Sequence, residues 1–263
     1  MKTAFDPRIV AFVDILGFES LVQKLENDPA LHEKLNYALR RIKHLKVSSL
    51  EGNTAQSDLE ISVFSDSIAI SAPKSNYHGV IWTAIHLQSD LLTLGLLTRG
   101  GISCGKTVHK DDILYGEGII NAYKLESRAA IYPRILVDCS VLKLLNDGYR
   151  SIFLRKDTDG LWHLDLFSIG FLPSGSDALV EDGWDPHEVG LDELKRAIDK
   201  SRSDLTNLGQ VAKWNWLAEK RQCAVEEYRI LGKPRFWVAF DQKHSQDKDA
   251  QQGAAADAAS LRH

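Results

Sequence analysis

The fold is decided by the stretch Ile9-Val10-Ala11-Phe12-Val13-Asp14-Ile15-Leu16-Gly17-Phe18. Its apolar run is typical of a strand buried on both faces, and Gly17 marks a tight turn into a helical pattern. Asp14 is out of place there, because an unpaired charge in a protein core is strongly disfavoured. We therefore expect Asp14 to end a buried strand and to use its charge for binding.

A second acid stands in a similar setting later in the chain. Two short apolar runs, 59–64 and 67–72, flank Ser65-Asp66, which predicts a hairpin with Asp66 at its tip. Two acids at strand ends can hold two divalent cations about 3.5–4 Å apart, and magnesium or manganese prefers such oxygen ligands. The alternative for each Asp is a turn cap, but the repeated pattern favours a shared metal site.

The composition is that of an ordinary globular protein. The chain has 263 residues, of which 44% are hydrophobic and 26% charged, and its net charge is -4. This charge gives no reason to expect nucleic-acid binding, and no apolar run reaches the roughly 20 residues that span a bilayer. Three scattered cysteines favour a reducing compartment. We expect a cytoplasmic protein that binds neither nucleic acid nor membrane.

Helical and strand patterns alternate along the rest of the chain. Helical spacing covers 18–25, 30–45, 77–95, 119–130, 140–145 and 188–230, and strand patterns cover 97–108, 134–138, 151–155 and 161–167. This mixture of hairpins and crossovers predicts an α+β fold with a mainly antiparallel sheet. We expect a catalytic domain at 1–171, a linker and helical appendage at 172–241, and a disordered tail at 242–263.

Four motifs between residues 8 and 138 carry a family resemblance. They are Phe12-Val13-Asp14-Ile15-Leu16-Gly17-Phe18, Phe64-Ser65-Asp66, Arg99-Gly100-Gly101-Ile102-Ser103-Cys104-Gly105, and Tyr115-Gly116 followed by Ala122-Tyr123-Lys124-Leu125-Glu126. In this order they resemble the class III nucleotide cyclases, which implies a ferredoxin-like catalytic domain. Their details are similar to the Pycsar pyrimidine cyclases, bacterial antiviral enzymes that make cyclic UMP or cyclic CMP.

The resemblance implies a two-metal site. Asp14 and Asp66 would hold two divalent cations, Mn²⁺ or Mg²⁺, with the backbone carbonyl of Ile15 as a third ligand. The ribose 3'-hydroxyl of a nucleoside triphosphate would attack the α-phosphate in line, and pyrophosphate would leave. The expected activity is therefore that of a nucleotide cyclase, a phosphorus–oxygen lyase.

The resemblance also implies phosphate contacts. Backbone amides at a helix N-terminus would face the triphosphate, and they belong to Leu16, Gly17 and Phe18. Arg99 would contact the triphosphate from a strand, and its alternative is a solvent-exposed strand end.

Two departures from the family pattern concern catalysis and base recognition. The transition-state arginine of the family falls on Lys124, a point charge rather than a planar fork, and Arg128 one turn later is a substitute. Because this residue acts from the other subunit in the family, we expect a homodimer with composite active sites. The base-reading positions fall on Ser62 and Ile113, which cannot reproduce purine contacts. The resemblance favours UTP over CTP, although these two residues do not choose between them.

Several alternatives remain open. The first alternative is an adenylyl or guanylyl cyclase with altered base recognition. The second is a protein with the cyclase fold that binds nucleotide as a sensor and has no catalytic activity. A GGDEF-like synthase is disfavoured because its signature hairpin is missing from the sequence. We expect His109 in a solvated turn rather than a metal cluster, and Trp214 and Trp216 packing the appendage onto the core.

Overall fold

The computed structural model describes residues 5–44, 59–111, 113–170, 185–203 and 207–243. Within these ranges the strands are β1 (Pro7–Ile15), β2 (Glu60–Phe64), β3 (Ser67–Pro73), β4 (Thr98–Lys110), β5 (Ile113–Gly116), β6 (Ile135–Val137), β7 (Leu154–Lys156) and β8 (Trp162–Leu164). The helices are α1 (Phe18–Leu25), α2 (Pro29–His44), α3 (Tyr77–Thr93), α4 (Glu117–Ala129), α5 (Cys139–Leu142), α6 (Asp147–Phe153), α8 (Pro186–Ser203) and α9 (Leu208–Leu231), with a 3₁₀ turn at Lys74–Asn76.

The strands form one sheet in the order β2-β3-β1-β4-β6-β8-β7, with β5 paired to β4 outside this path. All neighbouring pairs are antiparallel except β4 and β6. Together with the C-terminal helices, this topology confirms the predicted α+β fold with a mainly antiparallel sheet. β1 is central, as its apolar run predicts, and Ile9, Ala11 and Val13 are fully buried in the core.

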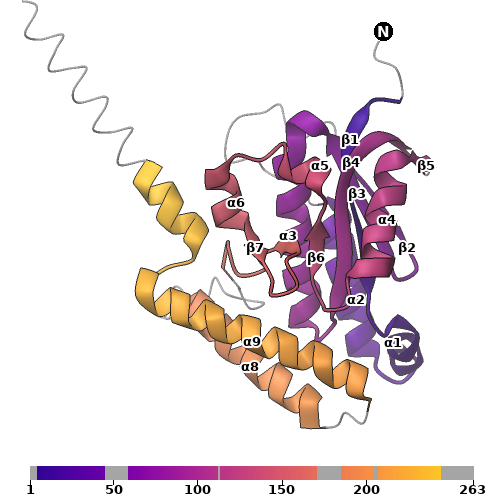
Figure 1. Cartoon of the computed structure of the whole chain (residues 1–263). Coiled ribbons are helices and arrows are strands. Elements are labelled where there is room, and N and C mark those ends of the chain that lie inside the picture. Colours follow the sequence, from indigo (N-terminus) through magenta and orange to yellow (C-terminus); the bar gives the residue numbers. More distant parts are fainter. Residues whose placement is uncertain (1–4, 45–58, 112, 171–184, 204–206, 244–263) are drawn as a thin grey trace, which may run out of the picture.

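The two faces of the sheet are covered differently (Figure 1). α3, backed by α2, packs on one face, while α4 packs on the other face against β1 and β4. Two glycines of β4 allow this close approach. A Cβ on Gly101 would lie 2.4 Å from the carbonyl oxygen of Ala122, and one on Gly105 would lie 2.8 Å from the amide of Gly118. The glycines that weaken β4 as a strand are therefore required by α4.

The helices α8 and α9 form an antiparallel pair along one end of the sheet domain (Figure 1). Trp214 and Leu217 of α9 are buried in a second apolar cluster with Leu97, the residue just before β4, and Leu16 packs against this cluster. The prediction that the α9 tryptophans pack the appendage on the core is thus confirmed for Trp214. Trp216 also contributes, because its indole N–H donates to Asp157 Oδ2 at 2.8 Å.

Some sequence-based boundaries were wrong. Residues 151–153, predicted as strand, belong to helix α6, whose first turn is capped by Asn146 accepting from the amide of Tyr149. The short strand β5 was not predicted, because four residues are too few to show a period. Residues 51–58, most of the expected linker and nearly all of the expected tail lie outside the described residues. None of the described helices is long and apolar enough to cross a membrane.

Candidate active site

The end of β1 and the tip of the β2–β3 hairpin bring two acids together. Asp14 is paired with Ser67 of β3 and with Arg99 of β4. The amide of Ile15 donates to the carbonyl oxygen of Asp66 at 2.9 Å, which ties the hairpin tip to the end of β1. Ser65, just before Asp66, has a φ of 54°, a left-handed conformation that is uncommon for a residue with a Cβ. The predicted neighbourhood of Asp14 and Asp66 is present.

The electrostatics of this corner favour the arrival of positive charge. Burial raises the pKa of Asp14, and the negative charge of Asp66 adds to this effect, while the Arg99 guanidinium opposes it. Two half-buried carboxylates at one sheet edge are the oxygen donors that magnesium or manganese accepts. The donor chemistry of the pair therefore fits a divalent cation, with Ile15 next to Asp14 as the predicted backbone ligand. Among the described residues, no three His, Cys, Asp or Glu side chains cluster as a metal site.

Arg99 lies between two acids, one of which was not predicted. Its Nε is 3.4 Å from Asp14 Oδ2 and 2.6 Å from Glu126 Oε1. Glu126 is only 3% exposed, and it lies on the buried stripe of α4 that begins with Gly118 and Ala122. A glutamate that continues the small-residue stripe of a helix at four-residue steps is the sequence signal that would have identified it. Burial raises the pKa of Glu126, against the lowering effect of Arg99.

The predicted phosphate amides are only partly available. The amide of Leu16 donates to the carbonyl oxygen of Leu97 at 2.8 Å, so it does not face a phosphate in this structure. Gly17 adopts the left-handed conformation, with φ 74° and ψ 23°, and Phe18 begins α1. The amides of Gly17 and Phe18 remain the predicted donors at this helix N-terminus.

Ser62 belongs to a polar network that holds it in place. Its Oγ is 2.9 Å from His109 Nε2, and the other ring nitrogen of His109 is 2.8 Å from Ser71 Oγ. Arg8 donates to the same Ser71 oxygen at 3.0 Å. His109 is 4% exposed, so the expectation of a solvated turn was wrong. Strand β4 extends beyond its predicted end and includes His109, whose ring contacts serines of β2 and β3.

The second predicted base position is Ile113. It lies on β5 opposite Lys110 and is 60% exposed. Its neighbour Leu114 pairs with His109 and so shares the face of the Ser62 network, whereas Ile113, one residue earlier in the strand, points to the other face. The structure therefore does not bring the side chains of the two predicted base positions, Ser62 and Ile113, together.

The predicted catalytic cations do not face the acids of their own chain. Successive residues of an α-helix are rotated by about 100°, so residues two apart point to nearly opposite sides. Glu126 points at Arg99, whereas Lys124 and Arg128, two positions before and after it, are exposed. Within one chain, the structure therefore does not assemble Lys124 or Arg128 with Asp14.

Comparisons with known proteins complete the description of the site. No protein family model and no curated protein matches the chain. Among solved structures, the chain is similar to the adenylyl cyclase CyaB from P. aeruginosa, with 19% identity, a TM-score of 0.46, and coverage of 60% of this chain and 93% of that chain.

Two further solved structures are similar. The guanylyl cyclase domain of a RhoGC fusion protein from the aquatic fungus Blastocladiella emersonii has 14% identity, a TM-score of 0.41, and coverage of 61% and 95%. A class III adenylyl cyclase-like ATP-binding protein from Pseudomonas aeruginosa has 11% identity, a TM-score of 0.38, and coverage of 59% and 37%. Because these TM-scores lie below 0.5, residue roles rest on the chain's own geometry.

Proposed function

We propose that this chain is a class III nucleotide cyclase that converts a pyrimidine nucleoside triphosphate, UTP in preference to CTP, into its 3',5'-cyclic monophosphate and pyrophosphate. The proposal rests on the corner where Asp14 of β1, Arg99 of β4 and Asp66 in the β2–β3 turn lie side by side. The resemblance to the Pycsar cyclases supports a role in antiviral signalling.

The mechanism assigns a task to each group at this corner. Asp14 and Asp66, with the carbonyl of Ile15, would hold two divalent cations, Mn²⁺ or Mg²⁺, which supply charge for acidifying the ribose 3'-hydroxyl and for stabilising the leaving pyrophosphate. The amides of Gly17 and Phe18 bind the phosphates at the start of α1. Once nucleotide is bound, Arg99 exchanges its contact with Asp14 for the triphosphate.

Glu126 sets the position of Arg99 in this mechanism. The carboxylate of Glu126 is buried, and its ion pair with Arg99 keeps the guanidinium at the sheet edge beside Asp14. A buried charge pair of this kind restricts orientation more than it adds stability. Glu126 therefore acts as a positioning residue for Arg99 rather than through contact with the reacting atoms.

The residues at the two predicted base positions reduce the support for a purine substrate. Ser62 carries a short hydroxyl that His109 already engages, and Ile113 has no polar atom in its side chain. Neither residue supplies the paired donor and acceptor that a purine edge requires. An adenylyl or guanylyl cyclase is therefore the second candidate, and it would need other residues to read the base.

The exposed cations of α4 support a dimer with composite sites. Lys124 and Arg128 project from α4 away from the acids of their own chain, so a second copy has to present them to Asp14. Large apolar side chains are also exposed on and beside α4, as a covered interface requires. They are Ile113 and Tyr115 of β5, and Ile120 and Tyr123 of α4.

The experiment that tests this function is product formation by the purified chain with UTP and Mn²⁺. We expect cyclic UMP and pyrophosphate from the wild type, and a loss of about 100-fold or more in kcat for Asp14→Asn, because the cation ligand is removed. Asp147→Asn, which changes an exposed acid on α6, is the matched control and should keep full activity. Equal turnover by the wild type and Asp14→Asn would refute the catalytic role. Nucleotide binding without turnover would indicate the sensor alternative.

Mixing two inactive variants tests the composite site in the same assay. Asp14→Asn removes a metal ligand, and Lys124→Ala removes the catalytic cation that the other subunit is proposed to supply. If the two residues of one site come from two subunits, a mixed dimer keeps one intact site, and mixing restores activity that neither variant has alone. No recovery after subunit exchange, shown by co-purification of differently tagged chains, would contradict a site shared between two subunits.

A further inference from the structure

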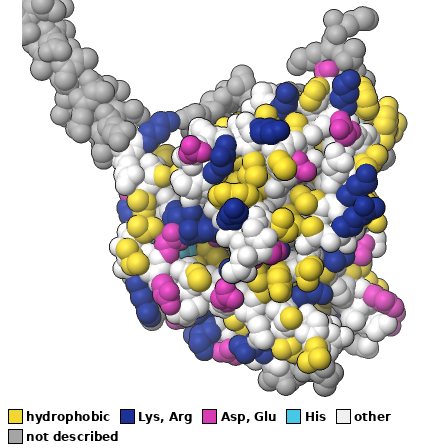
Figure 2. Space-filling view, viewed as in Figure 1, with side chains coloured by type: hydrophobic (Ala, Val, Ile, Leu, Met, Phe, Trp, Pro, Cys, Tyr) yellow, Lys and Arg dark blue, Asp and Glu magenta, His cyan; other side chains and the backbone are white. Residues whose placement is uncertain are grey.

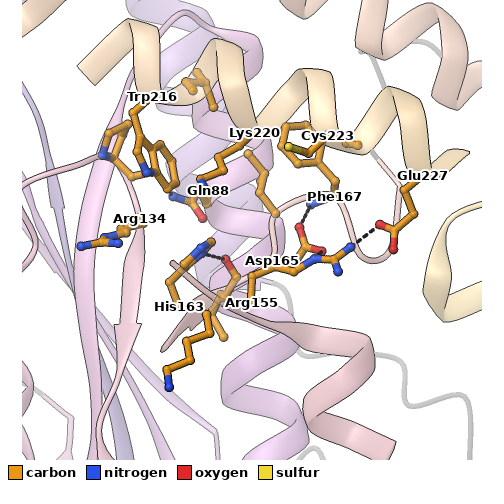
Figure 3. Close-up of a pocket in the computed structure, with 16 residues that line it drawn as sticks. Gln88, Arg134, Arg155, His163, Asp165, Phe167, Trp216, Lys220, Cys223 and Glu227 are labelled. Atoms are coloured by element: carbon orange, nitrogen blue, oxygen red, sulfur yellow. Dashed lines mark hydrogen bonds and ion pairs between the residues drawn. The ribbon is translucent and has the colours of Figure 1, made fainter. Parts of the chain in front are cut away.

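A cavity of about 310 Å³ lies between α9 and the β7–β8 hairpin. Figure 2 shows a hollow on this face that is bordered by cationic and acidic side chains, and a histidine side chain (cyan) is visible inside it. Figure 3 shows the side chains that α9 and the hairpin turn toward one another across it. The volume is at the lower end of the range for small-molecule sites, about 300–1,000 Å³. None of Asp14, Asp66, Arg99 and Glu126 lines this cavity.

The floor of the cavity offers hydrogen-bond acceptors. His163 is 4% exposed, and its Nδ1 lies 2.8 Å from the carbonyl oxygen of Leu164. A carbonyl only accepts, so Nδ1 carries the proton and Nε2 is an acceptor. Burial lowers the pKa of His163, which keeps the ring neutral. Nε2 has no hydrogen-bond partner among the residues that the structure describes.

Gln88 of α3 adds a second acceptor to the same cavity. Its Nε2 donates to the carbonyl oxygen of Pro133 at 3.1 Å. This bond sets the orientation of the side-chain amide and leaves Oε1 as the remaining acceptor. A ligand that satisfies Gln88 and His163 together must bring its own N–H or O–H donors.

The walls and the rim of the cavity differ in character. The walls are apolar and include Leu164, Leu166 and Phe167. The rim carries Arg155, which pairs with Asp165 and Glu227 through Nε and one terminal nitrogen and so keeps further N–H donors for another anion. Of the other cationic side chains that line the cavity, Arg134 and Lys220 already pair with Asp157, so Arg155 and Lys156 are the ones that could meet an anion.

From this arrangement we infer that the cavity is a second small-molecule site, which takes a heterocyclic anion whose base edge carries N–H donors. A nucleoside monophosphate presents this chemistry. Its base edge would donate to His163 and Gln88 between the apolar walls, and its phosphate would meet Arg155 at the rim. The inference does not depend on the cyclase reaction, since it uses none of the residues of that site.

A cysteine at the cavity makes binding measurable without any activity. Cys223 of α9 lines the cavity and is exposed, while Cys139 on α5 is exposed elsewhere. The full chain is incubated in EDTA, which removes cations from Asp14 and Asp66, with AMP, GMP, CMP or UMP in turn. The rates of iodoacetamide alkylation at both cysteines are followed by peptide mass spectrometry. We expect at least one nucleotide to slow alkylation of Cys223 saturably and to leave Cys139 unchanged. No protection of Cys223 by any of the four at millimolar concentration would overturn the inference.

Two variants separate specific binding from general shielding. His163→Phe keeps the ring and removes the acceptor, so the protecting nucleotide should bind about fivefold more weakly or worse. His32→Phe, at an exposed histidine of α2, is the control and should bind normally. Unchanged protection in His163→Phe would overturn the inference. If that variant does not fold, Cys223→Trp, which fills the cavity from an exposed position, should abolish binding measured by calorimetry, and retained binding would contradict the site.

Discussion

His109 is buried between Ser62 and Ser71, and its charge state links pH to stability. Burial, and to a lesser extent the charge of Arg8, lowers its pKa from 6.5 to about 4. Between about pH 4 and pH 6.5, His109 is therefore protonated in the unfolded chain and neutral in the folded chain. The stabilisation is fully present above about pH 6.5 and is lost as the pH falls toward 4.

This shift predicts that the free energy of unfolding falls by about 2 kcal/mol between pH 7 and pH 5 through His109 alone. Urea unfolding at both pH values measures the change. His109→Gln keeps a polar group without a titrating ring, so its loss over the same interval should be smaller than that of the wild type by this amount. Because the raised pKa values of Asp14 and Glu126 act in the opposite direction, only the difference between the two proteins isolates the histidine. An equal fall in the free energy of unfolding for both proteins would show that the pKa of His109 is not lowered by folding.

Single residues differ in how well the sequence predicted them. Asp14 was identified because a charge interrupts an apolar run, and the structure puts it near Asp66, as expected, and also beside Arg99. Glu126 was missed because the stripe that begins with Gly118 and Ala122 indicates its burial, but not its partner Arg99 on β4. His109 was misplaced for the same kind of reason, since its partners lie on β2 and β3, far away in the sequence.

Of the two glycines of β4 that allow the close approach of α4, Gly101 lies at the closer contact. A Cβ at Gly101 would lie 2.4 Å from the backbone of Ala122 and 2.8 Å from Leu125 Cβ. Neither of these atoms is the end of a flexible side chain, so the helix itself has to move. Such a movement separates Glu126 from Arg99.

We predict that Gly101→Ala lowers the free energy of unfolding by about 1–3 kcal/mol, as overpacking does, and reduces cyclisation further by displacing Arg99. Chemical denaturation and turnover measure the two effects. Gly148→Ala in α6 is the matched control, because its Cβ would have only an ordinary contact at 3.5 Å. It should change stability by less than about 1 kcal/mol. A fully stable and active Gly101→Ala would show that α4 does not need this close approach.

Long helices and strands, in which the hydrophobic pattern repeats several times, were predicted better than short ones. The helices α2 and α3 and the strands β1 and β4 lie within a few residues of their predicted bounds, since each repeats its pattern over many residues. α6 and β5 were not recognised. α6 has seven residues and was partly read as strand, because Ile152, Phe153 and Leu154 form an apolar run that fits both structures.

At the scale of the whole molecule, the appendage and the candidate active site share a core. Trp214 and Leu217 of α9 pack with Leu97, and Leu16 beside them follows directly after Ile15. The amide of Leu16 also donates to Leu97, so the appendage supports the strand ends that carry the acids. The sequence indicated that tryptophans would pack the appendage, but not where, because that contact joins segments more than a hundred residues apart.

We propose that the corner of Asp14, Asp66 and Arg99 cyclises pyrimidine nucleotides. The most direct measurement is incubation of the purified chain with UTP, CTP, ATP and GTP separately, each with Mn²⁺, followed by identification of the products by mass spectrometry. Our assignment predicts 3',5'-cyclic UMP as the main product, cyclic CMP as the lesser one, and pyrophosphate in equal amount. Cyclic AMP or cyclic GMP as the only product would contradict it.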